Sequence, residues 1–424
     1  MYVPNDNKFL RKNTVFLLII CFILILIILS GLVAHIGGMA FLICEFTYGR
    51  CSELSTLSKY CNCRVTEKEK TKEEKKNFIL FKPEEKKQKQ EYEKRTILIT
   101  SLPRSGSSFL GEIFNRQKDV FYFYEPLQPL NALSQLISSY NYEKQAVTLL
   151  SNFFVCNFEG YQDYFNFLSY PELSNPHFRL MSRVLSMQPF CAKRVLPNST
   201  AEEYTKYCVN INVKLLRKSC NTKSIYVIKE LLHRLPSDIS KIQFSSYISL
   251  IRDPRAIVWS MKKNKWVDNK GYFASTEYEA IEKVCHIFRN NYFSMLNSNR
   301  LNKLVILRYE DLVKYPKTTV KDLFQATKTF FYRNIDDTVE WVNVNTHGKS
   351  ETGSSSFSVL MKNASYSLNS WRENLSFDSV LEIQNKCGDV MQLLGYVLYT
   401  SSKDLRDFSK TSVVRVIPLK NIFK

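Results

Sequence analysis

A short run of arginine, serine and glycine suits the binding of an anion. It is the loop "RSGSS", which follows the β-branched run "TILIT" and precedes an amphipathic helical pattern. Backbone N–H groups at such a strand-to-helix turn point at one spot, where the helix dipole adds partial positive charge. Serine hydroxyls and an arginine fork also donate to phosphate or sulfate oxygens. The residues leave open a purely structural turn capped by serines. The loop consists of Arg104, Ser105, Gly106, Ser107 and Ser108.

A second segment, "YISLIRDPRAIVWSMKK", has the same design. A hydrophobic run ends at Arg252, and Ser260 follows eight residues later on the expected helix. These two side chains could converge on a second phosphate, whereas Asp253 and Arg255 are interpreted as a structural salt bridge. The first loop lacks the lysine of G-x-x-x-x-G-K-[ST], and no metal carboxylate accompanies it, so a P-loop kinase is disfavoured.

The elements that would position these loops alternate between short β-rich runs and longer helical patterns. The clearest helices are expected at 276–296, where apolar residues recur every three or four positions, and at 376–395, where Ser376 is the cap. This alternation predicts an α/β fold with a mostly parallel sheet covered by helices on both faces. The block from 156 to 220 is interpreted as an insertion. The expected strands are Thr96–Thr100, Val120–Tyr124, Ser224–Ile228, Tyr247–Ile251 and Lys303–Leu307.

The N-terminus predicts a membrane anchor. Residues Val15–Ala34 are almost entirely apolar, and at ~1.5 Å per residue they span about 30 Å, the thickness of a bilayer core. Basic residues precede this run, which places the rest of the chain in the lumen or outside. A cleaved signal peptide is the alternative. We expect a cytoplasmic tail (1–13), an anchor (14–34), a charged stem (35–95), a lumenal domain (96–400) and a basic tail (401–424).

Composition agrees with an exported protein that binds anions. The 424 residues carry a formal net charge of +19, which favours polyanionic partners. None of the eleven cysteines forms a zinc-type pair, so disulfides are expected, with a local bridge within the group Cys191, Cys208 and Cys220. N-x-S/T sequons occur at Asn198, Asn363 and Asn374.

Four segments in this order carry a resemblance to a known family: "RSGSSFLGEIFNRQKDVFYFYEPL", "LIRDPRAIVWS", "RYEDLVKYP" and "NASYSLNSWRENL…LLGY". Together they resemble the Golgi carbohydrate sulfotransferases, in the branch that acts on the 6-hydroxyl of galactose, N-acetylglucosamine or N-acetylgalactosamine. The resemblance spans about Thr96 to Tyr399. It implies a type II anchor, a stem and a P-loop-like α/β domain that uses 3′-phosphoadenosine 5′-phosphosulfate (PAPS) and no metal.

The resemblance assigns the first loop, Arg104–Ser108, to the 5′-phosphosulfate, and Arg252 and Ser260 to the 3′-phosphate of the donor. Many other sulfotransferases have a lysine where this chain has Arg104. The family often has an arginine after the serine of the second motif, whereas Met261 follows Ser260 here, with Lys262 and Lys263 next to it.

The same resemblance implies catalytic residues. Glu125 matches the family's Glu-Pro site and is the expected base, kept ionised by Arg104; a helix-capping carboxylate is the alternative. Lys229 matches a family lysine that could reach the donor's sulfate, or it is a surface lysine. His233 is interpreted as a bystander. Further candidates are Arg308, Lys362 and Arg372 at the donor site, Tyr124 in an acceptor cleft, and Trp371 in the core.

These inferences predict a Golgi membrane enzyme that transfers a sulfuryl group from PAPS to a glycan of the keratan, chondroitin, N-linked or O-linked type. Its partners are a glycan acceptor and a membrane, not a nucleic acid. A homodimer is one alternative for the oligomeric state. The rival hypothesis is a catalytically inactive glycan-binding protein with the same fold.

Overall fold

The computed structural model describes residues 94–134, 141–170, 175–268, 272–296, 303–329, 335–347 and 364–414. The chain divides into two units, Met1–Lys89 and Gln90–Lys424, and every described residue lies in the second. The expected tail and anchor, and nearly all of the stem, therefore lie outside the described residues. Within the described part, no helix is long and apolar enough to cross a membrane.

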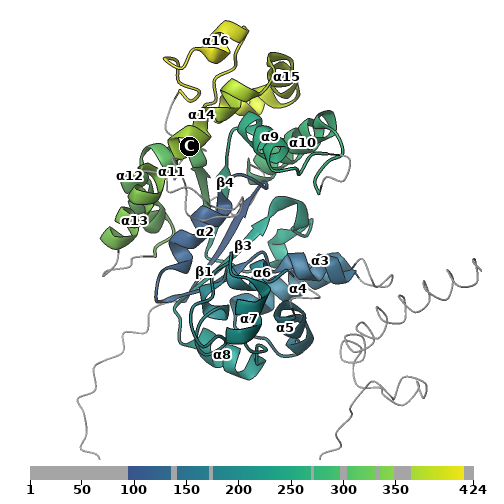
Figure 1. Ribbon diagram of the computed structural model, residues 1–424, viewed down its shortest axis with the longest axis vertical. Coiled ribbons are helices and arrows are strands. Elements are labelled where there is room, and N and C mark those ends of the chain that lie inside the picture. The colour runs from purple at the N-terminus through teal and green to yellow at the C-terminus, as the bar shows by residue number, and fades with distance from the viewer. Residues whose placement is uncertain are drawn as a thin grey trace, which may run out of the picture. The chain divides into compact units, whose positions relative to one another are not determined.

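A five-stranded parallel sheet forms the centre of the domain, in the order β2-β3-β1-β4-β5 (Figure 1). All five strands expected from the sequence are present, with bounds that shift by no more than a few residues. The predicted α/β fold with a parallel sheet is confirmed. The strands are β1 (Arg95–Ser101), β2 (Val120–Tyr124), β3 (Ile225–Leu231), β4 (Ser246–Ile251) and β5 (Leu304–Arg308).

Helices cover both faces of the sheet because side chains along each strand alternate between them. Ile97 and Ile99 of β1 pack into one apolar cluster with α2, α11, α12 and α13, whereas Leu98 packs into the other with α4, α9, α10 and α15. Figure 1 shows α11–α13 and α9–α10 on opposite sides of the strands. The helices are α2 (Ser107–Asn115), α3 (Leu127–Ser134), α4 (Tyr142–Phe154), α5 (Gln162–Ser169), α6 (His177–Leu180), α7 (Ala201–Tyr207), α8 (Val213–Asn221), α9 (Pro254–Lys263), α10 (Glu277–Leu296), α11 (Tyr309–Lys314), α12 (Pro316–Ala326), α13 (Ile335–His347), α14 (Ala364–Asn374), α15 (Phe377–Leu393) and α16 (Ser402–Arg406).

Both helices singled out in the sequence form. They are α10 and α15, and the hydroxyl of Ser376 accepts from the backbone N–H of Ser379 as the expected N-cap. A disulfide between Cys285 and Cys387 ties the two helices together.

The long segment between β2 and β3 is stabilised by two disulfides. Cys156–Cys220 closes it, and Cys191–Cys208 is the local bridge that the sequence predicted. Inside it the buried guanidinium of Arg179 donates to the carbonyl oxygens of Leu185, Phe190 and Val209. These hydrogen bonds satisfy the donors of the buried guanidinium and join three parts of this segment.

Candidate functional site

The carboxyl ends of the five strands bring the candidate residues to one edge of the sheet. Because every strand is parallel, the loops after β1, β2, β3 and β4 emerge on the same side. β1 is central, with β3 on one flank and β4 on the other, and ligands of open α/β sheets bind at such a switch in strand order. Arg104, Glu125 and Arg252 all follow strand ends there, and Lys229 lies near the end of β3.

The loop after β1 adopts a backbone that leaves polar groups available to an anion. Arg104 and Gly106 both have positive φ, 64° and 88°, and α2 begins at Ser107. No described side chain caps this helix start, and the buried Ser105 Oγ has no hydrogen-bond partner among the described residues. Ser108 Oγ lies 3.2 Å from the hydroxyl oxygen of Tyr124. Uncapped first-turn amides together with an unsatisfied buried hydroxyl suit a phosphate or sulfate group.

Replacing Gly106 by alanine is expected to destabilise the protein by about 2–5 kcal/mol, since a left-handed backbone costs about 1–2 kcal/mol and overpacking about 1–3 kcal/mol. An added Cβ would lie 2.5 Å from the ring of Tyr309. Gly160, also at positive φ, has nothing within 4 Å of an added Cβ, so Gly160→Ala controls for backbone strain alone. Urea denaturation measures both free energies of unfolding. Equal losses for the two variants would contradict the steric argument.

The second arginine-containing segment joins the first loop directly. Arg104 Nε donates to Ser260 Oγ over 3.2 Å, although the residues are 156 positions apart. Arg252 Nη1 donates to the carbonyl oxygen of Arg104 over 2.7 Å and Nη2 to that of Ser367 over 2.9 Å, while its buried Nε has no partner among the described residues. Burial, with the nearby Arg252 cation, lowers the pKa of Arg104. The structure thus brings Arg104, Arg252 and Ser260 together.

Glu125 is held by two buried cations. Its carboxylate forms ion pairs with Lys229 and, over 2.7 Å, with Arg234. Burial alone would raise the Glu125 pKa, but Lys229 and Arg234 lower it to about 2. Burial lowers the pKa of Lys229, and Glu125 offsets part of that effect. The sequence named Arg104 as the cation that keeps Glu125 ionised; the observed ion pairs are with Lys229 and Arg234.

Arg234 is the site residue that the sequence analysis missed. It lies five positions after Lys229, in the 3-10 turn Leu232–Arg234 that follows β3, and its N–H groups also reach Glu230, over 3.3 Å. The only signal available was a charged residue just beyond a strand end. The neighbouring His233, interpreted as a bystander, is exposed.

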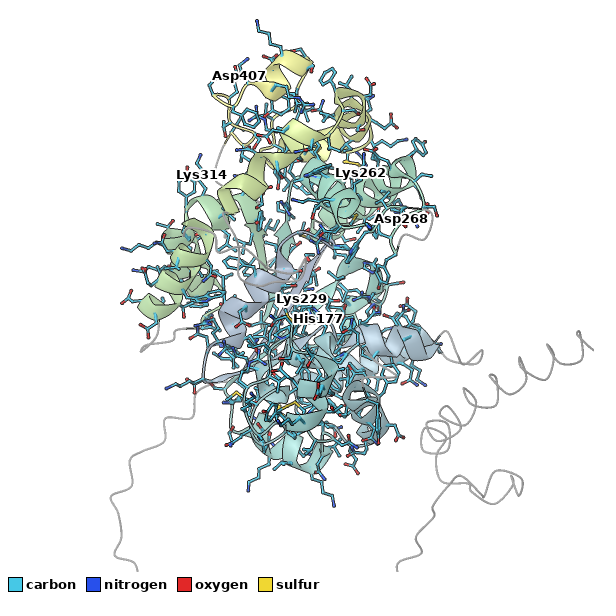
Figure 2. The ribbon with its side chains drawn as sticks, viewed as in Figure 1. His177, Lys229, Lys262, Asp268, Lys314 and Asp407 are labelled. Atoms are coloured by element: carbon cyan, nitrogen blue, oxygen red, sulfur yellow. A yellow bond between two sulfur atoms is a disulfide. The ribbon has the colours of Figure 1, made fainter. Side chains whose placement is uncertain are left out.

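Tyr124 does not present its ring to solvent. It is 7% exposed and lies against the Lys229 ammonium, 4.6 Å from its ring centre, and against the rings of His177 and Phe178. The expectation that it lines an acceptor cleft as a stacking surface is therefore wrong. His177 and Lys229 are labelled in Figure 2. Burial lowers the pKa of His177 to about 4, so that it is neutral near pH 7.

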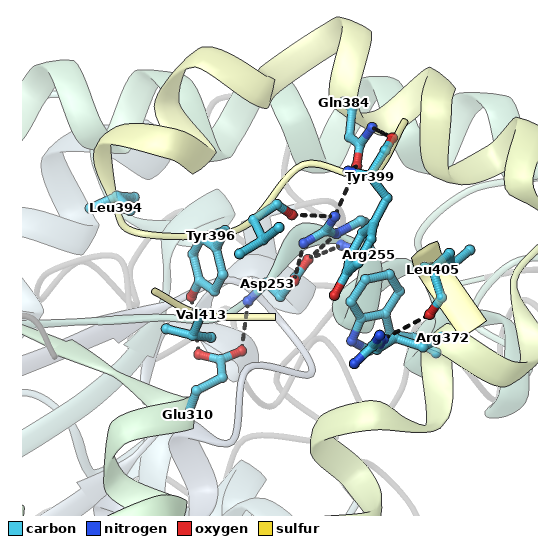
Figure 3. Close-up of polar contacts among 12 residues, drawn as sticks. Asp253, Arg255, Glu310, Arg372, Gln384, Leu394, Tyr396, Tyr399, Leu405 and Val413 are labelled. Carbon is cyan, nitrogen blue, oxygen red and sulfur yellow. Dashed lines mark hydrogen bonds and ion pairs between the residues drawn. The ribbon is translucent and has the colours of Figure 1, made fainter. Parts of the chain in front are cut away.

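The remaining arginines near this edge are structural. Arg255 forms the predicted ion pair with Asp253, over 2.7 Å, and also donates to Gln384 and to the carbonyl oxygen of Val397 (Figure 3). Arg372 donates to carbonyl oxygens of the 404–410 segment beside the buried Trp371. Arg308 pairs with Asp311 and donates to the carbonyl oxygen of Leu394. Thus Arg308 and Arg372 serve the fold in place of the expected donor contacts. Lys362 lies outside the described residues.

Protonation of Glu310 makes the stability of the protein depend on pH. It accepts from the backbone N–H of Asp253 and the hydroxyl of Tyr396 (Figure 3). Burial, together with the Asp253 carboxylate, raises its pKa to about 7 from an ordinary 4.5. The folded protein therefore keeps a proton that the unfolded chain has released. Stability from this group is complete below about pH 4.5 and is lost as the pH rises through about 7.

Consequently, the free energy of unfolding of Glu310→Gln is expected to fall less between pH 5 and 8 than that of the wild type. The difference is about 3 kcal/mol, at 1.36 kcal/mol for each unit between the folded and unfolded pKa values of Glu310. The amide does not ionise; its oxygen can accept from the backbone N–H of Asp253, and its NH2 group can donate to the hydroxyl oxygen of Tyr396. The free energy of unfolding measured across this range checks the prediction, with the exposed Glu159→Gln as control. A Glu310→Gln profile that parallels the wild type would refute it.

Comparison with known proteins identifies the family of this chain. The model of the sulfotransferase family matches residues 96–329, more than half of the chain, so the protein belongs to the sulfotransferase family. It is 26% identical to carbohydrate sulfotransferase 1 of Mus musculus over 344 residues, which cover 74% of this chain and 82% of that protein. It is 27% identical to carbohydrate sulfotransferase 3 of Homo sapiens over 338 residues, covering 72% and 68%. The resemblance to carbohydrate sulfotransferases is confirmed.

One solved structure, a mouse sulfotransferase complexed with PAP (3′-phosphoadenosine 5′-phosphate), aligns with this chain. The TM-score is 0.36 and the sequence identity 11%, over 74% of this chain and 90% of that one.

Proposed function

We propose that the protein transfers a sulfuryl group from PAPS to a hydroxyl group of a glycan. The observation that carries the proposal is the convergence, at one sheet edge, of an anion-binding loop with a buried carboxylate held by two cations. Membership of the sulfotransferase family supports sulfuryl transfer, and the names of the relatives support a carbohydrate acceptor.

The donor would lie across the carboxyl ends of β1 and β4. We assign the 5′-phosphosulfate to the amides and hydroxyls of Ser105–Ser108, and the 3′-phosphate to Ser260, Arg252 and the side chain of Arg104. The unsatisfied Ser105 Oγ and Arg252 Nε are buried donors that such a dianion would satisfy. The contact between Arg104 and Ser260 supports neighbouring positions for the two phosphates, and we propose that Arg104 contacts both.

Transfer would follow an in-line displacement. The carboxylate of Glu125 accepts the proton of the acceptor hydroxyl, whose oxygen forms the new bond to sulfur. The bond from sulfur to the bridging phosphate oxygen breaks, and the electron pair leaves with 3′-phosphoadenosine 5′-phosphate (PAP). A carboxylate with a pKa of about 2 is a weak base, so we propose that Lys229 shares its charge with the sulfuryl oxygens during transfer, which restores the basicity of Glu125. We propose this step without a metal.

The proposed acceptor position, membrane topology and localisation rest on the sequence alone. We propose transfer to the 6-hydroxyl of galactose, N-acetylglucosamine or N-acetylgalactosamine, because the quoted motifs resemble those of that branch. The proposed layout is a tail, an anchor at 14–34, a stem and a lumenal domain in the Golgi, with a homodimer as one state of assembly. Asn198 and Asn374 are exposed, as glycosylated sequons require.

The test uses the full-length chain, purified in detergent, with radiolabelled PAPS and a panel of keratan, chondroitin and N-acetylglucosamine-terminated acceptors. We expect label in the glycan, and disaccharide analysis then identifies the sulfated sugar and position. PAP binding without transfer to any acceptor would instead support an inactive glycan-binding protein. Failure to bind PAP would refute the sulfotransferase proposal.

A further inference from the structure

An exposed tyrosine is fixed in place beside the proposed catalytic carboxylate. Tyr272 is 58% exposed, yet its hydroxyl accepts from Arg234 Nη2 over 3.0 Å and donates to Gln128 Oε1 over 3.2 Å. Its ring meets that of Trp266 edge to face, with 5.2 Å between centroids. An exposed side chain ordinarily keeps its rotamer freedom, and ordering it costs free energy. This ring is instead held in one orientation from two sides.

The Tyr272 ring lies between the two parts of the site, the carboxylate of Glu125 and the loop that contains Arg104. Arg234, which holds the Tyr272 hydroxyl, also pairs with Glu125 over 2.7 Å. On the other side, the guanidinium of Arg104 lies 5.6 Å from the centre of the Trp266 ring. The aromatic pair Trp266–Tyr272 therefore reaches from the anion-binding loop to the carboxylate.

We propose that Tyr272, supported by Trp266, is the acceptor-binding platform on which the apolar face of a pyranose ring stacks. The C–H bonds on one face of a hexose carry small positive partial charges that match the negative face of an aromatic ring. A ring stacked on Tyr272 would direct an exocyclic hydroxymethyl group towards Glu125. The inference rests on the proposed function, and it replaces Tyr124, whose ring is covered, as the stacking residue.

Tyr278 provides a matched control. It has the same exposed fraction, 58%, but lies on α10 near the Lys386 ammonium, 5.2 Å from its ring centre. A general effect of removing an exposed aromatic ring would appear at both positions. A stacking effect would appear at Tyr272 alone.

The experiment compares Tyr272→Ala, Tyr272→Leu, Tyr272→Phe and Tyr278→Ala in the full-length chain. At saturating PAPS, we expect the KM for a soluble N-acetyllactosamine acceptor to rise about tenfold in the Ala and Leu variants. A tenfold rise corresponds to about 1.4 kcal/mol, near the upper end of what an aromatic contact contributes. Tyr272→Phe keeps the ring and should stay within about threefold of the wild type. PAP affinity, measured by calorimetry, should be unchanged in every variant, which also shows that the site is folded.

A second readout separates this inference from the proposed function. Saturation-transfer NMR of the same acceptor with PAP present reports sugar contact without turnover. A wild type that transfers no sulfate but shows a signal lost in Tyr272→Ala would refute the enzyme and support the platform. Normal transfer, with KM and NMR signal unchanged in Tyr272→Ala and Tyr272→Leu, would overturn the platform and leave the enzyme standing. Equal losses in Tyr278→Ala would also overturn it.

Discussion

Replacing Glu125 by glutamine is expected to slow sulfate transfer by about 10²–10⁴, while PAP affinity stays near the wild-type value. The amide has the shape of the carboxylate but cannot accept the proton of the acceptor hydroxyl. Donor contacts are assigned to other residues, so binding should persist. The measurement is the single-turnover rate with prebound PAPS, together with the PAP dissociation constant.

Glu230→Gln is the matched control for that experiment. Glu230 is buried, lies within reach of the same Arg234, and accepts from the backbone N–H groups of Leu127 and Leu231. Both variants leave Arg234 with one carboxylate fewer and should lower stability, since removing one partner of a buried ion pair costs about 3–5 kcal/mol. Only Glu125→Gln should slow sulfate transfer by about 10²–10⁴. Unaltered turnover in Glu125→Gln, or equal slowing in both, would remove Glu125 from the mechanism.

Replacing Arg104 by alanine is expected to weaken PAP binding by about 2–3 kcal/mol, or roughly 30- to 150-fold, because a charged hydrogen-bond donor is lost at an anion. Its side chain reaches Ser260, so contacts to both phosphates are affected. Calorimetric titration with PAP measures the change.

Arg252→Ala should weaken PAP binding by a similar amount. Part of this loss would come from the loop Arg104–Ser108, because Arg252 Nη1 donates to the carbonyl oxygen of Arg104 over 2.7 Å. The control is Arg289→Ala, whose partner is Asp389 on the surface and which should leave the dissociation constant unchanged. If PAP binds Arg104→Ala as tightly as the wild type, the donor assignment is wrong.

The strands and the helix starts were predictable because they depend on residues close in sequence. Apolar β-branched runs end at Gly, Ser, Pro or charged residues, and the five runs became the five strands. Ser376 caps α15, and Asp253 pairs with Arg255 two positions away. In each case a local hydrogen bond or ion pair decides the outcome, so no knowledge of the fold was required.

The partners of the site residues were not predictable in this way. Glu125 pairs with Lys229 and Arg234, 104 and 109 positions later, and Arg104 reaches Ser260 at a separation of 156. These contacts exist because β2 pairs with β3 and β1 pairs with β4, and no local pattern fixes that order of strands. Sequence reasoning therefore named the correct ends of strands but assigned Glu125 the wrong cation.

Exposure also depended on the tertiary structure. Tyr124 and Tyr272 are both aromatic residues near charged groups in the sequence, yet one ring is covered by His177 and Phe178 and the other is 58% exposed. By itself the sequence determined the five strands, the helices α10 and α15, and the family, because these follow from residue type and short-range spacing. Only the packed sheet decided which charges meet and which rings face solvent, since both depend on the order in which distant strands pair.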